Sequence, residues 1–327
     1  MSARDGAARL LSAAVWLLPP ARRDWGRAMR AELVAVTARR DRWTFAAGCT
    51  GAVLRQPGVL RSLVYSLVTV GGLAGVVVWS AAIVDPALRW DAVMLVAGLV
   101  AVSWLGRVAG PLGPVGAAGS ARTVRGFGSL AVAVAALGVV AGMNQIGQNQ
   151  EAEQVVPVLS GILVGYLAGF VAVTADRSPA TARTLWAAGG AAVGGALVWL
   201  ARAVLAPPIP ASAGFAAELL VCAMGIAAFL TRGQPSRRVL GALTAGAGLT
   251  LLVLIEVVLL SSYAPARMIP DLAPAALTPA DDLAQSRSEL QDPYVALMFL
   301  GALIALALGI TSLALRRRRA AGPMTSR

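Results

Sequence analysis

The sequence contains no histidine and no lysine, so all 28 of its basic residues are arginine. An intramembrane protease needs a Ser-His pair, an HExxH motif or paired aspartates, and none of these occurs in the apolar stretches. Only two cysteines are present, Cys49 in a basic segment and Cys222 inside an apolar one, so no disulfide is expected. Without histidine or a cysteine pair, a zinc site is not expected either. We therefore predict no enzyme activity and no cofactor or metal.

Charged residues of both signs are scarce. They make up 13% of the 327 residues, whereas soluble domains carry about 25%. Hydrophobic residues make up 57%, and the mean hydropathy is +0.72. A chain with so little polar surface is predicted to lie in a lipid bilayer. The net charge of +12 does not indicate nucleic-acid binding, because the arginines lie between apolar stretches and form no soluble basic face.

Eight stretches of about twenty residues carry almost no charge, and each is predicted to be a transmembrane helix. They are residues 62–84, 92–109, 126–146, 154–175, 184–205, 213–231, 239–262 and 294–315. The predicted fold is an all-α polytopic membrane bundle at 62–315, with a small helical head at 1–61 and a basic tail at 316–327. The stretch at 92–109 has the shortest apolar core, and Arg107 would extend from it to the interface.

The arginines are distributed unevenly between the two ends of these stretches. With a cytoplasmic N-terminus, 24 of the 28 arginines lie in cytoplasmic segments. The remaining four are Arg89, Arg202, Arg267 and Arg287. The positive-inside rule therefore predicts a multi-pass protein of the cytoplasmic membrane whose N- and C-termini both face the cytoplasm.

Two connecting segments are longer than the others. The Gly- and Pro-rich segment 106–125 lacks the Gly-Lys-Ser/Thr ending of a phosphate-binding loop and is interpreted as a linker. The segment 261–293 carries several acids, but their spacing matches no calcium loop. We interpret it as a solvated lid in which Asp281 caps a short helix.

Three ionisable residues, Arg202, Glu218 and Glu256, lie in the outer third of predicted spans. A charge that faces lipid is costly, so each residue has to pair, become protonated or face a cavity. Arg202 is the expected partner of one glutamate, and the other glutamate would share the arginine or be protonated. The preferred interpretation is structural: either a buried salt bridge that fixes helix contacts, or residues close enough to the interface to stay hydrated. A transport or sensing site is the alternative.

Glycines recur at four-residue spacing, which lets helix backbones approach closely in lipid. The pattern occurs at Gly71 and Gly75, Gly138 and Gly142, Gly190 and Gly194, and as a run of three at Gly161, Gly165 and Gly169. The pairs can simply reflect the abundance of glycine. We predict a helix-packing face at the run of three.

The segment 1–61 contains 11 arginines and three predicted helices. On the second helix an apolar stripe lies opposite three arginines. This candidate docking face consists of Trp25, Met29, Leu33, Arg23, Arg27 and Arg30. The helices either pack on one another as a small head, or lie flat on the inner leaflet with their arginines at anionic lipid headgroups. The flat arrangement is the preferred interpretation.

The stretch LLPPARRDWGRAMRAEL at residues 17–33, followed by RRDRWTFAAGC at 39–49, resembles the cytoplasmic prefix of a set of actinobacterial multi-pass membrane proteins. The matching positions are Pro20, Arg23, Trp25, Ala28, Met29, Ala31, Glu32 and Leu33. The resemblance covers about fifty residues. It implies permease-like or signalling proteins that are accessory to transcriptional regulators or transporters, and it implies no particular activity.

These patterns together predict a non-enzymatic integral membrane protein with a signalling, regulatory or accessory role. Its arginine-rich head would dock a cytoplasmic protein or the anionic lipids of the inner leaflet. The alternative is a transporter or permease subunit that uses Arg202, Glu218 and Glu256 as an outward-side charged site. In that case a transporter ATPase would be the cytoplasmic partner.

Overall fold

The computed structural model describes residues 5–18, 22–56, 86–106, 115–116, 119–146, 150–273 and 278–320, with isolated residues between 59 and 81. In this part of the chain the regular elements are helices, and β structure is limited to one bridge between Val115 and Ala175. The predicted all-α fold is thus confirmed for the described residues. The chain divides into two compact units, Met1–Gly75 and Val76–Arg327, which we call the head unit and the bundle unit.

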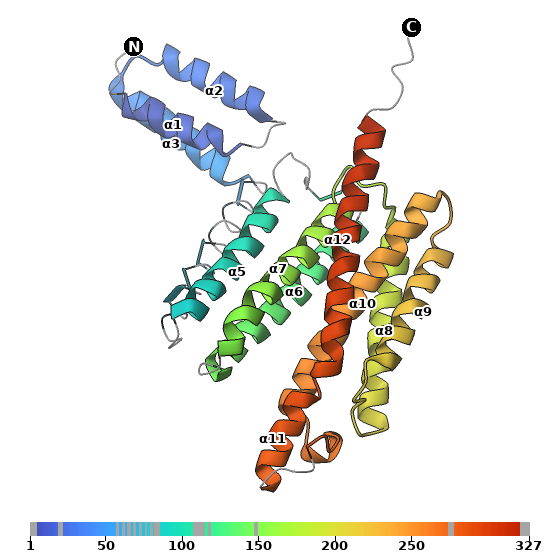
Figure 1. Cartoon of the computed structure of the whole chain (residues 1–327). Helices are drawn as coiled ribbons and strands as arrows, with labels where there is room; N and C mark the ends of the chain where they lie inside the picture. The colour runs from blue at the N-terminus through green and yellow to red at the C-terminus, as the bar shows by residue number, and fades with distance from the viewer. Residues whose placement is uncertain are drawn as a thin grey trace. The chain divides into compact units, whose positions relative to one another are not determined.

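The head unit contains three helices, α1 (Gly6–Trp16), α2 (Arg23–Ala35) and α3 (Arg39–Leu54) (Figure 1). They pack around a common apolar core. Its buried residues include Ala7, Leu11, Ala14, Val15, Leu18, Met29, Leu33, Ala46 and Val53. The three helices thus pack on one another, which was the alternative to the preferred flat arrangement, and Met29 and Leu33 of the α2 stripe are buried in this core. Contact of the head with the inner leaflet stays a prediction. Pro20, one of the positions that match the actinobacterial prefix, lies outside the described residues.

Glycine allows the close approach of α1 and α2. A Cβ atom on Gly26 of α2 would lie 2.5 Å from Cγ1 of Val15 and 3.0 Å from Cδ1 of Leu18. Any larger residue at this position would have to displace side chains of the core. The apolar periodicity of α2 therefore serves to hold the head together.

One ion pair joins the start of α1 to α3. The Asp5 carboxylate caps α1 by accepting a hydrogen bond from the N–H of Ala8, and it also pairs with Arg42 of α3. Arg42 donates two further hydrogen bonds to the carbonyl oxygens of Leu33 and Val36 at the end of α2, at 2.8 and 2.7 Å. A single guanidinium therefore connects all three helices of the head.

The Asp5–Arg42 pair predicts a pH dependence of head stability. The side-chain hydrogen bond from Arg42 holds the pKa of Asp5 below its ordinary value. The ionised Asp5 carboxylate therefore stabilises the folded head at pH values above the pKa of Asp5 in the unfolded chain. This stabilisation is lost as the pH falls through the lower pKa of Asp5 in the folded head. We expect hydrogen-exchange protection factors in α1 and α3 to fall when wild type is acidified below about pH 4, the ordinary range of aspartate.

The comparison is with Asp5→Asn. Its amides in α1 and α3 should have lower protection factors at pH 7, and those factors should fall less on acidification than in wild type. Asp24→Asn is the matched control, because it removes an exposed pair with Arg27 inside α2 alone. Equal pH profiles for wild type and Asp5→Asn would contradict the prediction.

The bundle unit consists of α5 (Pro86–Leu105), α6 (Gly119–Ile146), α7 (Gln150–Val173), α8 (Ala182–Leu205), α9 (Gly214–Leu230), α10 (Pro235–Tyr263), α11 (Pro279–Glu289) and α12 (Asp292–Ala320). In the described residues four helical runs are long and apolar enough to cross a membrane. These runs are Gly119–Val139, Ala182–Leu205, Pro235–Tyr263 and Pro279–Arg318. The apolar helices Pro157–Val173 and Gly214–Leu230 are shorter. The predicted span 62–84 falls mostly outside the described residues, and the number of eight spans stays a prediction.

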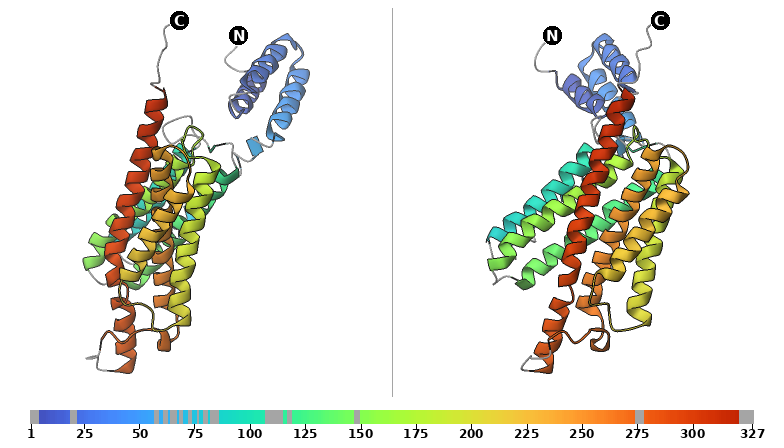
Figure 2. Two further views of the ribbon diagram at one scale, coloured as in Figure 1. Left: turned by 90° about the vertical axis from the view of Figure 1, so that its right-hand side faces the viewer. Right: turned by 45° about the vertical axis from the view of Figure 1, so that its right-hand side comes forward.

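α10 lies in the middle of the bundle unit, with α12 on one side and α8 and α9 on the other (Figure 2). Glycines bring these helices close together. A Cβ atom on Gly248 would lie 3.0 Å from Cβ of Ala192 in α8, and one on Gly246 would lie 3.0 Å from Sδ of Met224 in α9. α7 packs against α12 as well as α5 and α6, so it joins the two halves of the bundle.

The predicted packing face on α7 is used only in part. A Cβ atom on Gly169 would lie 2.8 Å from the carbonyl oxygen of Ala305 in α12, so the two backbones are in close contact there. At Gly165 the nearest atom would be 3.8 Å away, which is an ordinary contact, and at Gly161 nothing lies within 4 Å. α7 and α12 therefore diverge from Gly169 towards Gly161, and the face does not extend over the whole run.

A buried hydrogen-bonded chain crosses from α7 to α10. The hydroxyl of Tyr166 lies 2.8 Å from Oγ1 of Thr250, and Thr250 donates to the carbonyl oxygen of Gly246 at 2.9 Å. Gly301 of α12 lies directly against this pair, since a Cβ atom there would be 1.9 Å from Oη of Tyr166. Three helices thus meet at a point where α12 has no room for a side chain.

Arg125, near the start of α6, joins the ends of α5 and α7. Its Nε donates to Oγ1 of Thr174 at 2.8 Å, and its Nη groups donate to the carbonyl oxygens of Gly106 and Val171 at 2.9 Å. The last carbonyl groups of a helix have no donor within the helix, and a positive charge there also interacts favourably with the helix dipole. We call this arrangement the Arg125 clamp.

The segment predicted to be a lid is fastened to the end of α10 and to the loop that follows α8. Arg287 donates hydrogen bonds to the carbonyl oxygens of Ser261 and Ala264, and the N–H of Ile209 in that loop donates to the carbonyl oxygen of Met268 at 2.9 Å. The helix within this segment is α11, and the residue that caps it is Thr278, whose hydroxyl accepts from the N–H of Asp281. The predicted capping role of Asp281 is therefore wrong: Pro279 suits the first helical position, which makes the preceding residue the cap.

Candidate functional site

The three predicted intramembrane charges, Arg202, Glu218 and Glu256, form no ion pair with one another in the described part of the chain. The guanidinium of Arg202 instead donates to the carbonyl oxygen of Ala206 at the end of its own helix, where a positive charge is favourable. Glu218 is exposed on α9. The expected salt bridge is thus absent from the described part, because the guanidinium of Arg202 bonds to the end of its own helix and the carboxylate of Glu218 is exposed.

Glu256 is the one member of this set with a buried polar atom. Its side chain is half-buried in α10, and its Oε2 atom makes no hydrogen bond to the described residues. The buried rings of Trp199 in α8 and Tyr294 in α12 meet edge to face with their centroids 5.9 Å apart. Within the described residues, no group of three potential metal ligands exists. An acid without a charged partner can bind a proton, but a transport site needs further polar groups around it.

The candidate docking face is divided between the core and the surface of the head. Met29 and Leu33 are only 4% and 2% exposed, so a partner cannot contact them. Arg23, Arg27 and Arg30 on the opposite side of α2 are exposed. The apolar part of the face is therefore structural, and only its arginines are available for binding, together with Trp25 at the boundary.

The surface of the head is strongly basic. Its exposed arginines are Arg9, Arg22, Arg23, Arg27, Arg30, Arg39, Arg40 and Arg55. The exposed acids are Asp24, Glu32 and Asp41, so arginines outnumber acids eight to three on the described surface. Three tryptophans are exposed on the same unit: Trp16, Trp25 and Trp43. Arginine and tryptophan are the residue types that most often dominate binding energy in protein interfaces.

No family model, curated protein or solved structure matches the chain. The likeness of residues 17–33 to the actinobacterial prefix thus stays a prediction. Any function has to follow from the residues and their geometry.

The sequence patterns missed two arrangements that the structure contains. The Arg125 clamp involves an arginine that looks like any other positive charge at a membrane boundary, and no local pattern separates it from Arg122 one turn earlier. The Tyr166–Thr250 hydrogen bond joins two residues 84 positions apart. Only the order of helices in the bundle reveals either of them.

Proposed function

We propose that the protein is an integral membrane protein that binds an acidic cytoplasmic protein through the basic surface of its head, in a signalling, regulatory or accessory role without catalysis. The observation that carries this proposal is the core of the head. Met29 and Leu33 are buried inside it while eight arginines remain on the surface. A head that covers its own apolar stripe does not need acyl chains to cover it, which favours a protein partner over the inner leaflet.

The bundle unit is the proposed membrane anchor, with eight spans and both termini in the cytoplasm. Four long apolar helical runs and the asymmetry of the arginines support this arrangement. Large apolar side chains also remain exposed on the outside of the bundle, among them Val221, Phe229 and Ile310 at 71%, 85% and 68%. A bilayer would cover such a surface, whereas water would not tolerate it over so large an area.

Charge complementarity determines the class of partner. A surface that carries mostly arginine attracts an acidic protein, accelerates its encounter and repels other basic surfaces. The transporter alternative has less support, since neither Arg202 nor Glu218 forms an ion pair with another of the three charges in the described part of the chain.

The proposal is tested by crosslinking the full-length protein in its own membrane and identifying what co-purifies at low and at high salt. The double variant Arg23→Glu and Arg30→Glu should lose salt-sensitive partners about tenfold, a change of ~1.4 kcal/mol in binding free energy. The control is Arg317→Glu with Arg318→Glu, two exposed arginines at the other end of the chain.

Identical partner profiles for both double variants and wild type would overturn the proposal. It would also be wrong if no protein is lost but the head amides become protected from hydrogen exchange only in nanodiscs with anionic lipid. In that case the inner leaflet would be the partner.

A further inference from the structure

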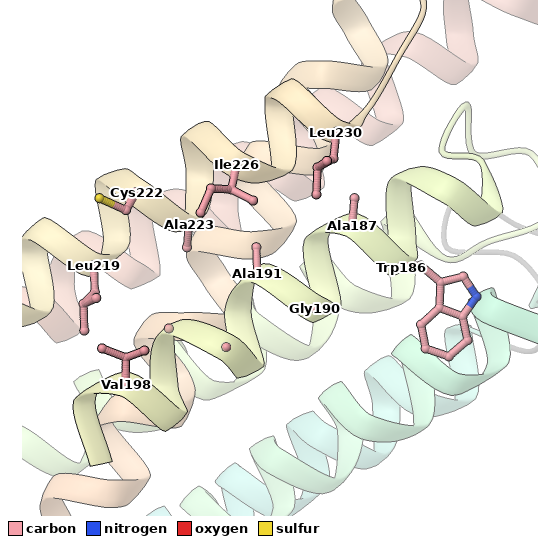
Figure 3. Close-up of a pocket in the computed structure, with 12 residues that line it drawn as sticks. Trp186, Ala187, Gly190, Ala191, Val198, Leu219, Cys222, Ala223, Ile226 and Leu230 are labelled. Carbon is pink, nitrogen blue, oxygen red and sulfur yellow. The ribbon is translucent and has the colours of Figure 1, made fainter. Parts of the chain in front are cut away.

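An apolar groove with a volume of about 420 Å³ runs between α8 and α9 on the bundle unit (Figure 3). Ala187 and Ala191 of α8 point towards α9, and Ile226 and Leu230 of α9 point back towards α8 (Figure 3). Gly190 and Gly194, one of the glycine pairs noted in the sequence, line the groove. Nothing lies within 4 Å of a Cβ atom at either position. Among the described residues no helix packs against this pair, which leaves an open groove.

The dimensions of the groove decide what can occupy it. Its lining on α8 extends from Trp186 to Val198, a length of about 18 Å at the α-helical rise. The groove is narrow, because α8 and α9 pack against each other along it. Its length and its apolar lining suit one extended hydrocarbon chain.

A cation lies at one end of the groove. The Nε group of Arg183 donates to the carbonyl oxygen of Leu230, a residue of the groove lining, at 3.0 Å. Arg183 is exposed, and its Nη groups have no further partner in the described part of the chain. A guanidinium held in this way keeps both Nη groups free for a phosphate, which arginine binds in a bidentate manner.

The chain around this end adds more positive charge. Arg232 is exposed and follows Leu230 by two residues, and the segment 231–238 contains Arg237 and Arg238 but no acid. An anionic group at this position would therefore meet several arginines and no nearby acid of the same segment. The apolar groove fits the acyl chain of an anionic phospholipid, and the charged end fits its headgroup.

We propose that the groove binds one phospholipid with an anionic headgroup, whose acyl chain lies between α8 and α9 and whose phosphate contacts Arg183. The acyl chain moves from the apolar bilayer into an equally apolar groove. It therefore contributes to the binding free energy through dispersion contacts with the groove and not through the hydrophobic effect. The preference for an anionic lipid comes from the arginines. This inference rests on the proposed membrane location of the bundle, and it is independent of the docking role of the head.

The test is native mass spectrometry of the full-length protein with phosphatidylglycerol or phosphatidylcholine of identical chains, with thermal unfolding as a second readout. Wild type should retain one phosphatidylglycerol per chain at least tenfold better than phosphatidylcholine. Gly190→Leu with Gly194→Leu fills the groove and should reduce retention of both lipids about tenfold. Arg183→Gln should remove most of the headgroup preference and leave phosphatidylcholine binding unchanged.

The matched controls lie outside the groove. Gly138→Leu adds the same side chain to an equally open position of α6, and Arg122→Gln removes an exposed arginine of α6. Both should bind lipid like wild type. Arg23→Glu with Arg30→Glu should also do so, which separates a failure of this inference from a failure of the docking proposal.

Three outcomes would overturn the inference. The groove-filled variant could retain phosphatidylglycerol like wild type. Inorganic phosphate at the same concentration could stabilise the protein as well as the lipid does, which would show that no acyl chain takes part. Finally, filling the groove could dissociate a dimer without loss of lipid, which would identify a second copy as the occupant. A chain that stays dissolved without detergent would instead refute the membrane location itself.

Discussion

Gly301→Ala is expected to destabilise the bundle by about 3 kcal/mol, through overpacking of ~1–3 kcal/mol and a disturbed hydrogen bond of ~1 kcal/mol. The added Cβ atom would lie 1.9 Å from Oη of Tyr166 and 2.5 Å from Oγ1 of Thr250. Both side chains are almost fully buried, so neither can turn towards the outside. Thermal unfolding of the purified full-length protein in detergent would measure the loss.

Two further variants make this result specific. Gly309→Ala adds the same methyl group to the same helix, where the nearest atom would be 4.0 Å away, and its cost should stay within ~0.5 kcal/mol. Tyr166→Phe removes the hydroxyl that clashes, so the double variant with Gly301→Ala should be more stable than the sum of the single effects by about 1 kcal/mol. If Gly301→Ala and Gly309→Ala have the same unfolding temperature, the three helices do not meet as described.

Arg125→Ala should have the second largest effect, a loss of about 2–3 kcal/mol, because hydrogen bonds from a charged donor contribute ~1.5–3 kcal/mol and this donor is only half-buried. The substitution leaves the carbonyl groups of Gly106 and Val171 and the hydroxyl of Thr174 without their donor. Arg125→Lys should recover only part of the loss, because one ammonium group cannot reach three acceptors in the geometry of a guanidinium.

Arg122→Ala provides the control for this prediction. It removes the same charge from the same helix one turn earlier, where the side chain is exposed, and should change stability by less than ~0.5 kcal/mol. The measurement is again thermal unfolding in detergent. Equal unfolding temperatures for the two alanine variants would show that Arg125 acts only as a positive charge at the end of a helix.

The positions of the helices could be predicted well from the sequence. The stretch 184–205 corresponds to α8 (Ala182–Leu205), and the stretch 239–262 corresponds to α10 (Pro235–Tyr263). A long apolar run favours a helix because in lipid its backbone groups have to bond to one another. The ends were less predictable: α6 begins at Gly119 and not at 126. The arginines near its start belong to the helix, since one of them bonds to two neighbouring helices.

The contacts between helices could not be predicted in the same way. The 3.6-residue period places Met29 and Leu33 on one face of α2, but it does not tell whether protein or lipid covers that face. Likewise, Arg202 and Glu256 are both predicted in the outer third of their spans, but the rotation of each helix about its axis decides whether the two side chains meet. The arrangement of the candidate site is a property of helix order and rotation, which a single sequence does not contain in its local patterns.

The core of the head is complete within the first sixty residues, which has a consequence for biosynthesis. Its buried residues and the guanidinium of Arg42 have all left the ribosome before most of the apolar segments are translated. Since chains grow at about 5–20 residues per second and early domains fold as units, the head is able to reach its native state many seconds ahead of the bundle. The bundle cannot assemble earlier, because α10 and α12, against which most of its helices pack, are among the last segments translated.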